Sequence, residues 1–235
     1  MSVSVIIAAG GQGTRLGAGV PKQWLAIGGR SLLERAIAAF DAHPRVTELV
    51  IVVPPGMTDA PVPATATPCR IVTGGARRQD SVAEGFAAVS ADAGVILVHD
   101  AARPFVTADV IDRAIDGAIA VGAVVPAVPV HDTVKQIVPG DTRVTATLPR
   151  ETLFLAQTPQ AFRREVLAAA IDAGRAGASG TDEAMLAEQA GHEVRLVAGD
   201  EANVKITTAA DLERARAVSP SDRATAPAFR IGTGY

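Results

Sequence analysis

Cysteine is nearly absent from this sequence, since Cys69 is the single one among 235 residues. An intramolecular disulfide and a metal site built from several cysteines are therefore excluded. Aromatic residues make up only 3% of the chain, whereas hydrophobic residues make up 48%. Because this length supports a sizeable core, we expect one large α/β domain, or one domain with an appendage, packed from Ala, Val, Ile and Leu.

The sequence also lacks an excess of charge and any long apolar run. Lys and Arg number 22 against 25 Asp and Glu, which gives a net charge of −3 with His neutral. No global positive field recruits nucleic acid or an anionic membrane, so local cations must hold any anionic ligand. No apolar segment reaches the roughly 18 residues of a membrane span, and Met1 precedes a short strand pattern rather than an export signal. We expect a cytoplasmic protein with no nucleic-acid or membrane partner.

The stretch 3–22 begins as an apolar run and continues into a glycine-rich loop that carries two cations. The run predicts a buried strand, and an open α/β sheet binds ligands at the carboxyl ends of its strands. Glycines let backbone N–H groups approach a phosphate, while Arg15 and Lys22 supply positive charge. We therefore predict a polyphosphate-binding loop, with a solvated glycine-rich turn as the alternative from this stretch alone.

Two familiar phosphate-loop motifs do not match this stretch. A dinucleotide fingerprint needs a glycine where Leu16 stands, and the strand predicted over 48–53 ends in two prolines instead of an acid for the ribose. A Walker loop needs Gly-Lys-Ser/Thr, whereas Lys22 lies in a Pro-Lys-Gln sequence. The remaining pattern is similar to the signature of nucleotidyltransferases that join an NTP to a phosphorylated sugar or polyol.

A second polar cluster follows the strand predicted over 95–98. Asp100 is well placed to hold Mg²⁺, which usually takes one or two protein carboxylates plus substrate phosphates. Arg103 precedes a proline that stiffens the turn, and we favour a substrate-phosphate contact over a surface charge because Arg matches phosphate oxygens bidentately. We interpret His99 as a structural histidine, since no partner residue type stands nearby to orient it as a base.

The remaining patterns predict alternating strands and helices, and hence a parallel sheet with right-handed crossovers. A capping box is expected at Ser31–Glu34 and another at Ser81–Glu84. The predicted helices cover 31–43, 107–122, 163–174 and 182–190, and a last one begins at 208. The predicted strands cover 3–9, 49–53, 70–73, 95–98, 123–128, 193–197 and 203–207.

Residues 130–155 follow a different pattern from the rest of the chain. Polar and apolar residues alternate on both sides of a Pro139-Gly140-Asp141 turn, which is typical of a hairpin with two partly solvated faces. A two-stranded arm is marginally stable alone and needs another surface. We therefore expect this arm to pair with a second subunit.

Taken together, the motifs resemble the 2-C-methyl-D-erythritol 4-phosphate cytidylyltransferase family from residue 3 to about 218. The motifs that carry the resemblance are Ala8-Ala9-Gly10, Pro21-Lys22-Gln23, Gly74-Gly75 to Asp80-Ser81, His99 to Pro104, Asp132-Thr133, Thr158-Pro159-Gln160, Thr181-Asp182-Glu183 and Asn203-Val204-Lys205. The resemblance implies a three-layer, mostly parallel Rossmann-like sheet of the nucleotidyltransferase type with a protruding β-arm. It also implies transfer of CMP from CTP to methylerythritol phosphate in non-mevalonate isoprenoid synthesis, with Mg²⁺ and a homodimer formed through the arm.

The resemblance assigns roles to individual residues. Arg15 and Lys22 would stabilise the transition state, and Arg150 and Lys205 would orient the attacking phosphate. The nucleotide would be held by Ala8, Ala9, Gly10, Gly11, Gly13, Gly75, Ser81 and Ala101. The polyol phosphate would contact Asp100, Arg103, Thr133, Thr158 and Thr181, and Asp100 would also contact Mg²⁺.

This sequence departs from the family pattern at two places, and two other functions compete with the one implied. The segment from Gly10 to Arg15 is one residue longer than usual, and Ala76 stands where the family often has Asp. A ribitol-5-phosphate cytidylyltransferase would share the loop, the acid and most of the fold. A nucleotide-binding module without turnover is the other alternative, against which the two loop cations argue.

The carboxyl-terminal residues predict a domain boundary. We expect a cytidylyltransferase domain over 1–218 and a linker over 219–228, because that stretch is rich in Ser, Pro and Ala. Residues 229–235 resemble the opening strand of 2-C-methyl-D-erythritol 2,4-cyclodiphosphate synthase, so they are expected to begin a second, fused domain. A loose terminus with an accidental match is the alternative.

Overall fold

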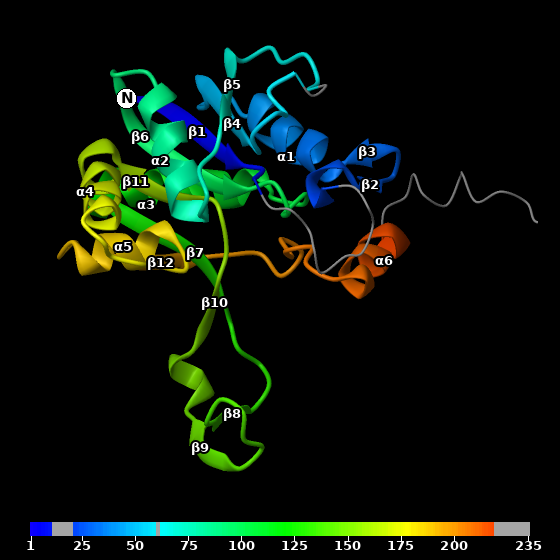
Figure 1. The fold of residues 1–235 in the computed structure, drawn as a ribbon, viewed down its shortest axis with the longest axis vertical. Coiled ribbons are helices and arrows are strands. Elements are labelled where there is room, and N and C mark those ends of the chain that lie inside the picture. Colours follow the sequence, from blue (N-terminus) through cyan, green and yellow to red (C-terminus); the bar gives the residue numbers. More distant parts are fainter. Residues whose placement is uncertain (11–20, 60–61, 219–235) are drawn as a thin grey trace, which may run out of the picture.

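The computed structural model describes residues 1–10, 21–59 and 62–218. Within them, one mostly parallel sheet has the strand order β10-β7-β11-β6-β1-β4-β5, with β12 beside β7 (Figure 1). The bounds are β1 (Ser2–Ala8), β4 (Glu48–Val53), β5 (Cys69–Thr73), β6 (Ala93–Asp100), β7 (Ala123–Pro129), β10 (Phe154–Ala156), β11 (Gln160–Arg163) and β12 (Arg195–Ala198). The strands β5, β4, β1 and β6 run parallel, whereas β11 is antiparallel to β6 and β7.

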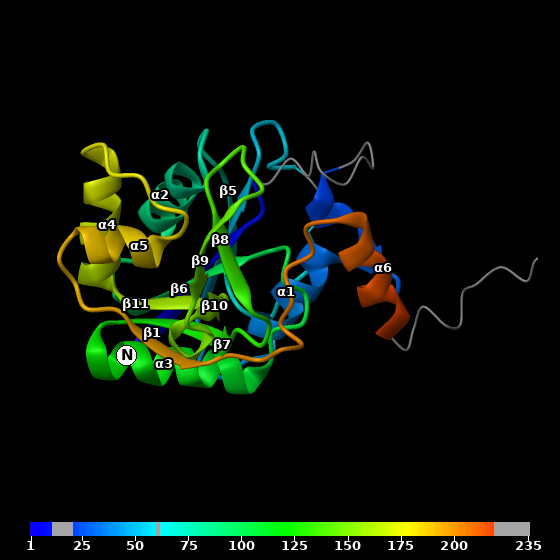
Figure 2. The ribbon, with the colours of Figure 1, turned by 90° about the horizontal axis from the view of Figure 1, so that it is seen from below.

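Helices cover both faces of this sheet and give three layers (Figure 2). Along β1, Val5 and Ile7 pack with α1 (Leu32–Asp41) and α3 (Ala108–Val121) on one face. Ile6, which points the other way, packs with α2 (Arg78–Ala88), α4 (Arg164–Arg175) and α5 (Glu183–Gln189). Side chains alternate between the faces of a strand, so the continuous apolar runs of the sequence become a sheet buried on both sides. The predicted three-layer α/β fold is confirmed.

A small satellite core holds the end of the described chain. It joins the ribbon β2 (Ala26–Ile27) and β3 (Arg30–Ser31) to α6 (Ala209–Val218) through Ile27, Leu212 and Ile206. None of the helices in the described part of the chain has the length and apolarity needed to cross a membrane.

The strand predicted over 203–207 is wrong. Ile206 is fully buried and its N–H donates to the Ala102 carbonyl, but the segment joins no ladder. Ala102 lies just beyond β6, and β6 pairs with β1 on one side and β11 on the other, so β6 offers this segment no free edge.

One predicted capping box is confirmed and the other is wrong. The Ser31 side chain accepts from the Glu34 N–H, and Glu34 accepts from the Ser31 N–H, at the start of α1. The helix α2 instead begins at Arg78, three residues before Ser81, because Asp80 accepts from the Arg77 N–H and caps the helix earlier.

The predicted arm is present as a hairpin that projects from the sheet (Figure 1). It consists of β8 (Val134–Ile137) and β9 (Val144–Leu148), followed by a short 3-10 turn over Arg150–Thr152. The arm and the strand β10 that follows it expose large apolar side chains, namely Ile137, Val138, Val144, Phe154 and Leu155.

His99 lies in β6 and is completely buried. Its Nε2 lies 3.1 Å from the Arg103 carbonyl and its Nδ1 lies 3.0 Å from the Thr158 hydroxyl. Because a carbonyl only accepts, Nε2 carries the proton and Nδ1 accepts from Thr158. Burial lowers the pKa of His99 to about 4, so the ring is neutral. The side chain therefore has a structural role, because its hydrogen bonds join β6 to the loop that follows it and to Thr158.

The buried neutral ring predicts a loss of stability in mild acid. The unfolded chain takes up the His99 proton near pH 6.5 and the folded chain only near pH 4, so stability falls as the pH drops through this window. Between pH 7 and pH 5 we expect His99 to lower the free energy of unfolding by about 2 kcal/mol. Guanidinium chloride unfolding at both pH values measures the drop, and His99→Gln is the control. Equal drops in wild type and variant would contradict this account.

Candidate active site

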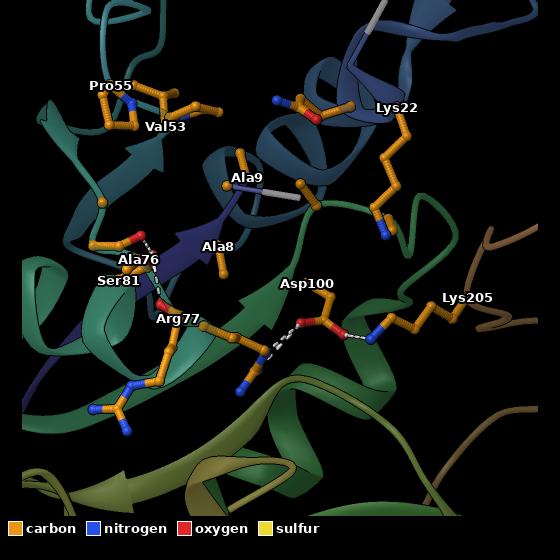
Figure 3. Close-up of a pocket in the computed structure, with 18 of the residues that line it drawn as sticks. Ala8, Ala9, Lys22, Val53, Pro55, Ala76, Arg77, Ser81, Asp100 and Lys205 are labelled. Atoms are coloured by element: carbon orange, nitrogen blue, oxygen red, sulfur yellow. Dashed lines mark hydrogen bonds and ion pairs between the residues drawn. The ribbon is translucent and has the colours of Figure 1, made fainter. Parts of the chain in front are cut away.

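A cavity of about 710 Å³ lies at the carboxyl ends of the parallel strands. Its walls come from the end of β1, the turns after β4 and β5, the end of β6, the segment at Lys22 and the segment at Lys205 (Figure 3). An open α/β sheet binds ligands at this edge, where the loops after neighbouring strands meet.

A glycine corner after β5 brings backbone groups close to this cavity. A Cβ on Gly74 would lie 2.6 Å from the Ser81 Oγ, so this position requires glycine. The Ser81 hydroxyl is buried and lies 3.1 Å from the Arg77 carbonyl and 3.3 Å from the Gly75 carbonyl. Ala76 lines the same wall and contributes no carboxylate.

The strongest electrostatic feature of the cavity is Asp100, the last residue of β6. Its Oδ2 lies 2.7 Å from the Lys205 Nζ (Figure 3). Its Oδ1 lies 3.2 Å from the Arg78 Nε. Burial by itself raises the pKa of this carboxyl, but Arg78 and Lys205 together hold it well below its usual range. Asp100 is therefore ionised and fixed between two cations.

A second cavity of about 200 Å³ adjoins the first. Arg78, Asp100 and Lys205 line both cavities and form the wall that they share. The other residues of the smaller cavity are mostly polar, namely Arg103, Ala156, Gln157, Thr158, Gln160, Thr181 and Asp182. Two ligands can therefore approach each other across Asp100.

Arg103 is more deeply buried than the sequence suggests. It donates from NH1 to the Asn203 carbonyl at 2.8 Å and from NH2 to the Ala156 carbonyl at 3.1 Å. Of its three side-chain nitrogens, only Nε lacks a hydrogen-bond partner among the described residues. Arg103 thus braces two backbone segments of the smaller cavity, and the predicted phosphate contact stays a prediction.

The structure brings most of the predicted site residues together. Those that line the larger cavity are Ala8, Ala9, Gly10, Lys22, Gly75, Ser81, Asp100, Ala101 and Lys205. Arg103, Thr158 and Thr181 line the smaller one. Gly11, Gly13 and Arg15 lie outside the described residues.

Two predicted residues lie apart from both cavities of this chain. Thr133 and Arg150 are exposed on the arm, and the Arg150 NH1 donates to the His131 carbonyl at 2.8 Å. Neither belongs to the walls of the cavities described above. The roles that the resemblance implies for them stay predictions.

Sequence reasoning missed Arg78 and Glu183. Both stand inside motifs that carry the family resemblance, but the resemblance implies no role for either. The signal that could have indicated Arg78 is its place directly after the glycine corner, at the start of a helix. Nothing local indicated that Glu183, 105 residues further along, is its partner.

The residues at Asp100 suit a divalent cation that is bridged by substrate. In the described part of the chain, no three His, Cys, Asp or Glu side chains are grouped to hold a metal. Mg²⁺ characteristically takes only one or two carboxylates and completes its shell with water and phosphate oxygens. A single ionised acid that lines both cavities matches that chemistry, and Lys205 would have to leave its Oδ2.

Three known proteins show what this chain is similar to. The bifunctional enzyme IspD/IspF of Anaeromyxobacter sp. (strain Fw109-5) is 46% identical over 239 residues, covering 99% of this chain and 60% of that protein. The 2-C-methyl-D-erythritol 4-phosphate cytidylyltransferase of Geobacter metallireducens is 44% identical, covering 92% of this chain and 97% of that protein. The crystal structure of the enzyme of that name from Thermus thermophilus has a TM-score of 0.78 at 38% identity, covering 93% of this chain and 99% of that one.

These matches differ in the share of each relative that they cover. The chain spans about 60% of the length of the bifunctional relative and nearly the whole of the single-function relative. The model of the 2-C-methyl-D-erythritol 4-phosphate cytidylyltransferase family matches residues 3–220, which is most of the sequence. The chain therefore belongs to the 2-C-methyl-D-erythritol 4-phosphate cytidylyltransferase family.

Proposed function

We propose that this chain transfers the cytidylyl group of CTP to 2-C-methyl-D-erythritol 4-phosphate and releases pyrophosphate. The observation that carries the proposal is the pair of cavities that share the wall of Arg78, Asp100 and Lys205. The larger cavity, with its glycine corner and Lys22, suits a nucleoside triphosphate. The smaller and more polar one suits a phosphorylated polyol.

The chemistry is an in-line displacement that needs positioning and charge neutralisation. A phosphate oxygen of the polyol phosphate attacks the α-phosphorus of CTP, and the bond from that phosphorus to the bridging oxygen of the β-phosphate breaks. The attacking phosphate is already ionised, so no general base is required. This agrees with the neutral, fully buried state of His99. Lys22 and Arg15 are proposed to neutralise the charge that develops on the transferred phosphoryl group.

Asp100 and Lys205 have linked roles in this proposal. Asp100 would hold Mg²⁺ together with substrate phosphate oxygens, and the bound ion would neutralise triphosphate charge. Lys205 is held 2.7 Å from the Asp100 Oδ2. Its side chain is 39% exposed, so it can move from Asp100 to an incoming phosphate. We propose that Lys205 orients the attacking phosphate in this way.

We also propose a homodimer in which the arm completes the partner's site. Its support is the cluster of exposed apolar side chains on the arm and on β10, together with the separation of Thr133 and Arg150 from the cavities of their own chain. A two-stranded hairpin with apolar side chains in water is marginal unless another surface covers it. We also propose that residues 219–228 are a linker and that residues 229–235 begin a fused cyclodiphosphate synthase domain; both stretches lie outside the described residues.

Pyrophosphate release with a panel of substrates tests the activity. With CTP and Mg²⁺ we expect the highest kcat/KM for 2-C-methyl-D-erythritol 4-phosphate, and much lower values for ribitol 5-phosphate and for erythritol 4-phosphate. Equal or faster turnover of ribitol 5-phosphate would overturn the assigned substrate.

Lys22→Ala should lower kcat on the order of 10³-fold because it removes a phosphoryl-clamping cation. Full activity in excess EDTA would remove the divalent cation from the mechanism.

Subunit mixing tests whether the arm serves a neighbouring site. An Arg150→Ala chain and a Lys22→Ala chain should each be nearly inactive alone. In a mixed dimer one of the two sites receives neither change, so we expect recovery of up to about half of the wild-type activity. Arg150→Ala chains mixed with one another, taken through the same procedure, are the control. Verified mixed dimers that regain no activity would show that each site is built from one chain.

A further inference from the structure

Arg78 lies inside one of the family motifs, but the resemblance implies no role for it. It is the first residue of α2, and it lines both the larger and the smaller cavity. Its Nε and NH2 each lie 3.2 Å from the Asp100 Oδ1, and its NH1 donates to the Glu183 Oε2. The guanidinium therefore lies between a carboxylate of the site and a carboxylate from α5.

Glu183 is a costly residue to bury, and stability does not account for it. It is 1% exposed, and its Oε1 has no hydrogen-bond partner among the described residues. Burial raises the pKa of Glu183, against which Arg78 acts. A buried ion pair is often no more stabilising than apolar residues of the same volume, and a buried oxygen without a hydrogen-bond partner is a further cost. What this pair supplies is the placement of the Arg78 side chain.

The negative charge of Asp100 at the shared wall explains why the position of the Arg78 side chain matters. A phosphate in the smaller cavity that reaches toward CTP passes near the ionised Asp100. Like charges that lie close together repel more strongly in a partly enclosed cavity than in bulk water. If Lys205 leaves the Asp100 Oδ2 for the phosphate, Arg78 is the side-chain cation that still contacts the carboxylate, at Oδ1. Each terminal guanidinium nitrogen carries a second N–H beyond these contacts.

We propose that Arg78, held in place by Glu183, is a further substrate-positioning residue of this enzyme. Arg78 fixes Asp100 through Oδ1, which leaves Oδ2 as the oxygen that exchanges its partner. Arg78 lines the smaller cavity, where its remaining N–H groups bind the phosphate of the polyol phosphate. This inference rests on the proposed function, because it names a residue for the acceptor side of that same reaction.

Steady-state kinetics of Arg78→Gln, Arg78→Lys and Glu183→Gln test the inference. Arg78→Gln should lower kcat/KM for the polyol phosphate by about 10²-fold, through a raised KM as well as a lowered kcat, because a misplaced acceptor loses that order of rate. The KM for CTP should stay within threefold. Arg78→Lys keeps the charge but not the planar fork, so its loss should be intermediate.

The role of Glu183 is tested by a double-mutant cycle. Glu183→Gln should change the same constants in the same direction but by less, about tenfold. If Glu183 acts through Arg78, the variant carrying both changes should be no worse than Arg78→Gln alone. Matched controls are Arg175→Gln on α4 and Glu188→Gln on α5, which are exposed and line neither cavity. Additive losses would overturn the link between Glu183 and Arg78.

Other outcomes separate this inference from the proposed function. An active wild type with Arg78→Gln within threefold for the polyol phosphate would overturn the inference alone, as would equal increases in the KM of both substrates. A wild type that releases no pyrophosphate would overturn the proposed function and this inference with it. Thermal unfolding reports whether each variant is folded. If Arg78→Gln is unfolded, Arg78→Lys decides, since a loss of threefold or more supports the inference and a smaller loss overturns it.

Discussion

The carboxylate of Asp100, held between Arg78 and Lys205, is the interaction on which the candidate site depends. It joins the end of a central strand to the start of a helix on one face of the sheet and to a segment near the end of the described chain. Both cavities use these three side chains as a common wall. Their charges make that wall compatible with two anionic ligands, because the acid alone would repel both of them.

The placement of Lys205 is in turn a consequence of packing behind it. The next residue, Ile206, is fully buried in the satellite core and its N–H is bonded to the Ala102 carbonyl. The following turn is tied by Asp211, which accepts from the N–H and the hydroxyl of Thr207 and from the N–H of Thr208. Those hydrogen bonds, led by the Thr207 hydroxyl, lower the pKa of Asp211 to about 2. A flexible lysine is thus presented by a segment that packing and hydrogen bonds hold in place.

Burial separates the residues that shape the site from those that are free to act in it. His99 and Arg103 are almost wholly enclosed, and their polar atoms are largely committed to Thr158 and to backbone carbonyls. Lys205 and Arg78 keep part of their side chains at the surface of the cavities. Behind Asp100, the buried carboxylate of Glu183 sets the position of Arg78, and Arg78 lines both cavities.

The layered α/β fold, the hairpin arm and the acid at the end of β6 can all be predicted from the sequence, because apolar periodicity and turn residues act over a few positions. Local patterns predicted the wrong start for α2, because Asp80 accepts from the Arg77 N–H and the helix begins before Ser81. They also predicted a strand over 203–207, but the neighbouring strand β6 has no free edge with which it could pair. The enclosure of Arg103 and the contact between Arg78 and Glu183 arise from the tertiary structure and not from local sequence. These side chains come from segments up to 105 residues apart, and their approach follows from the order of strands in the sheet, which no local pattern encodes.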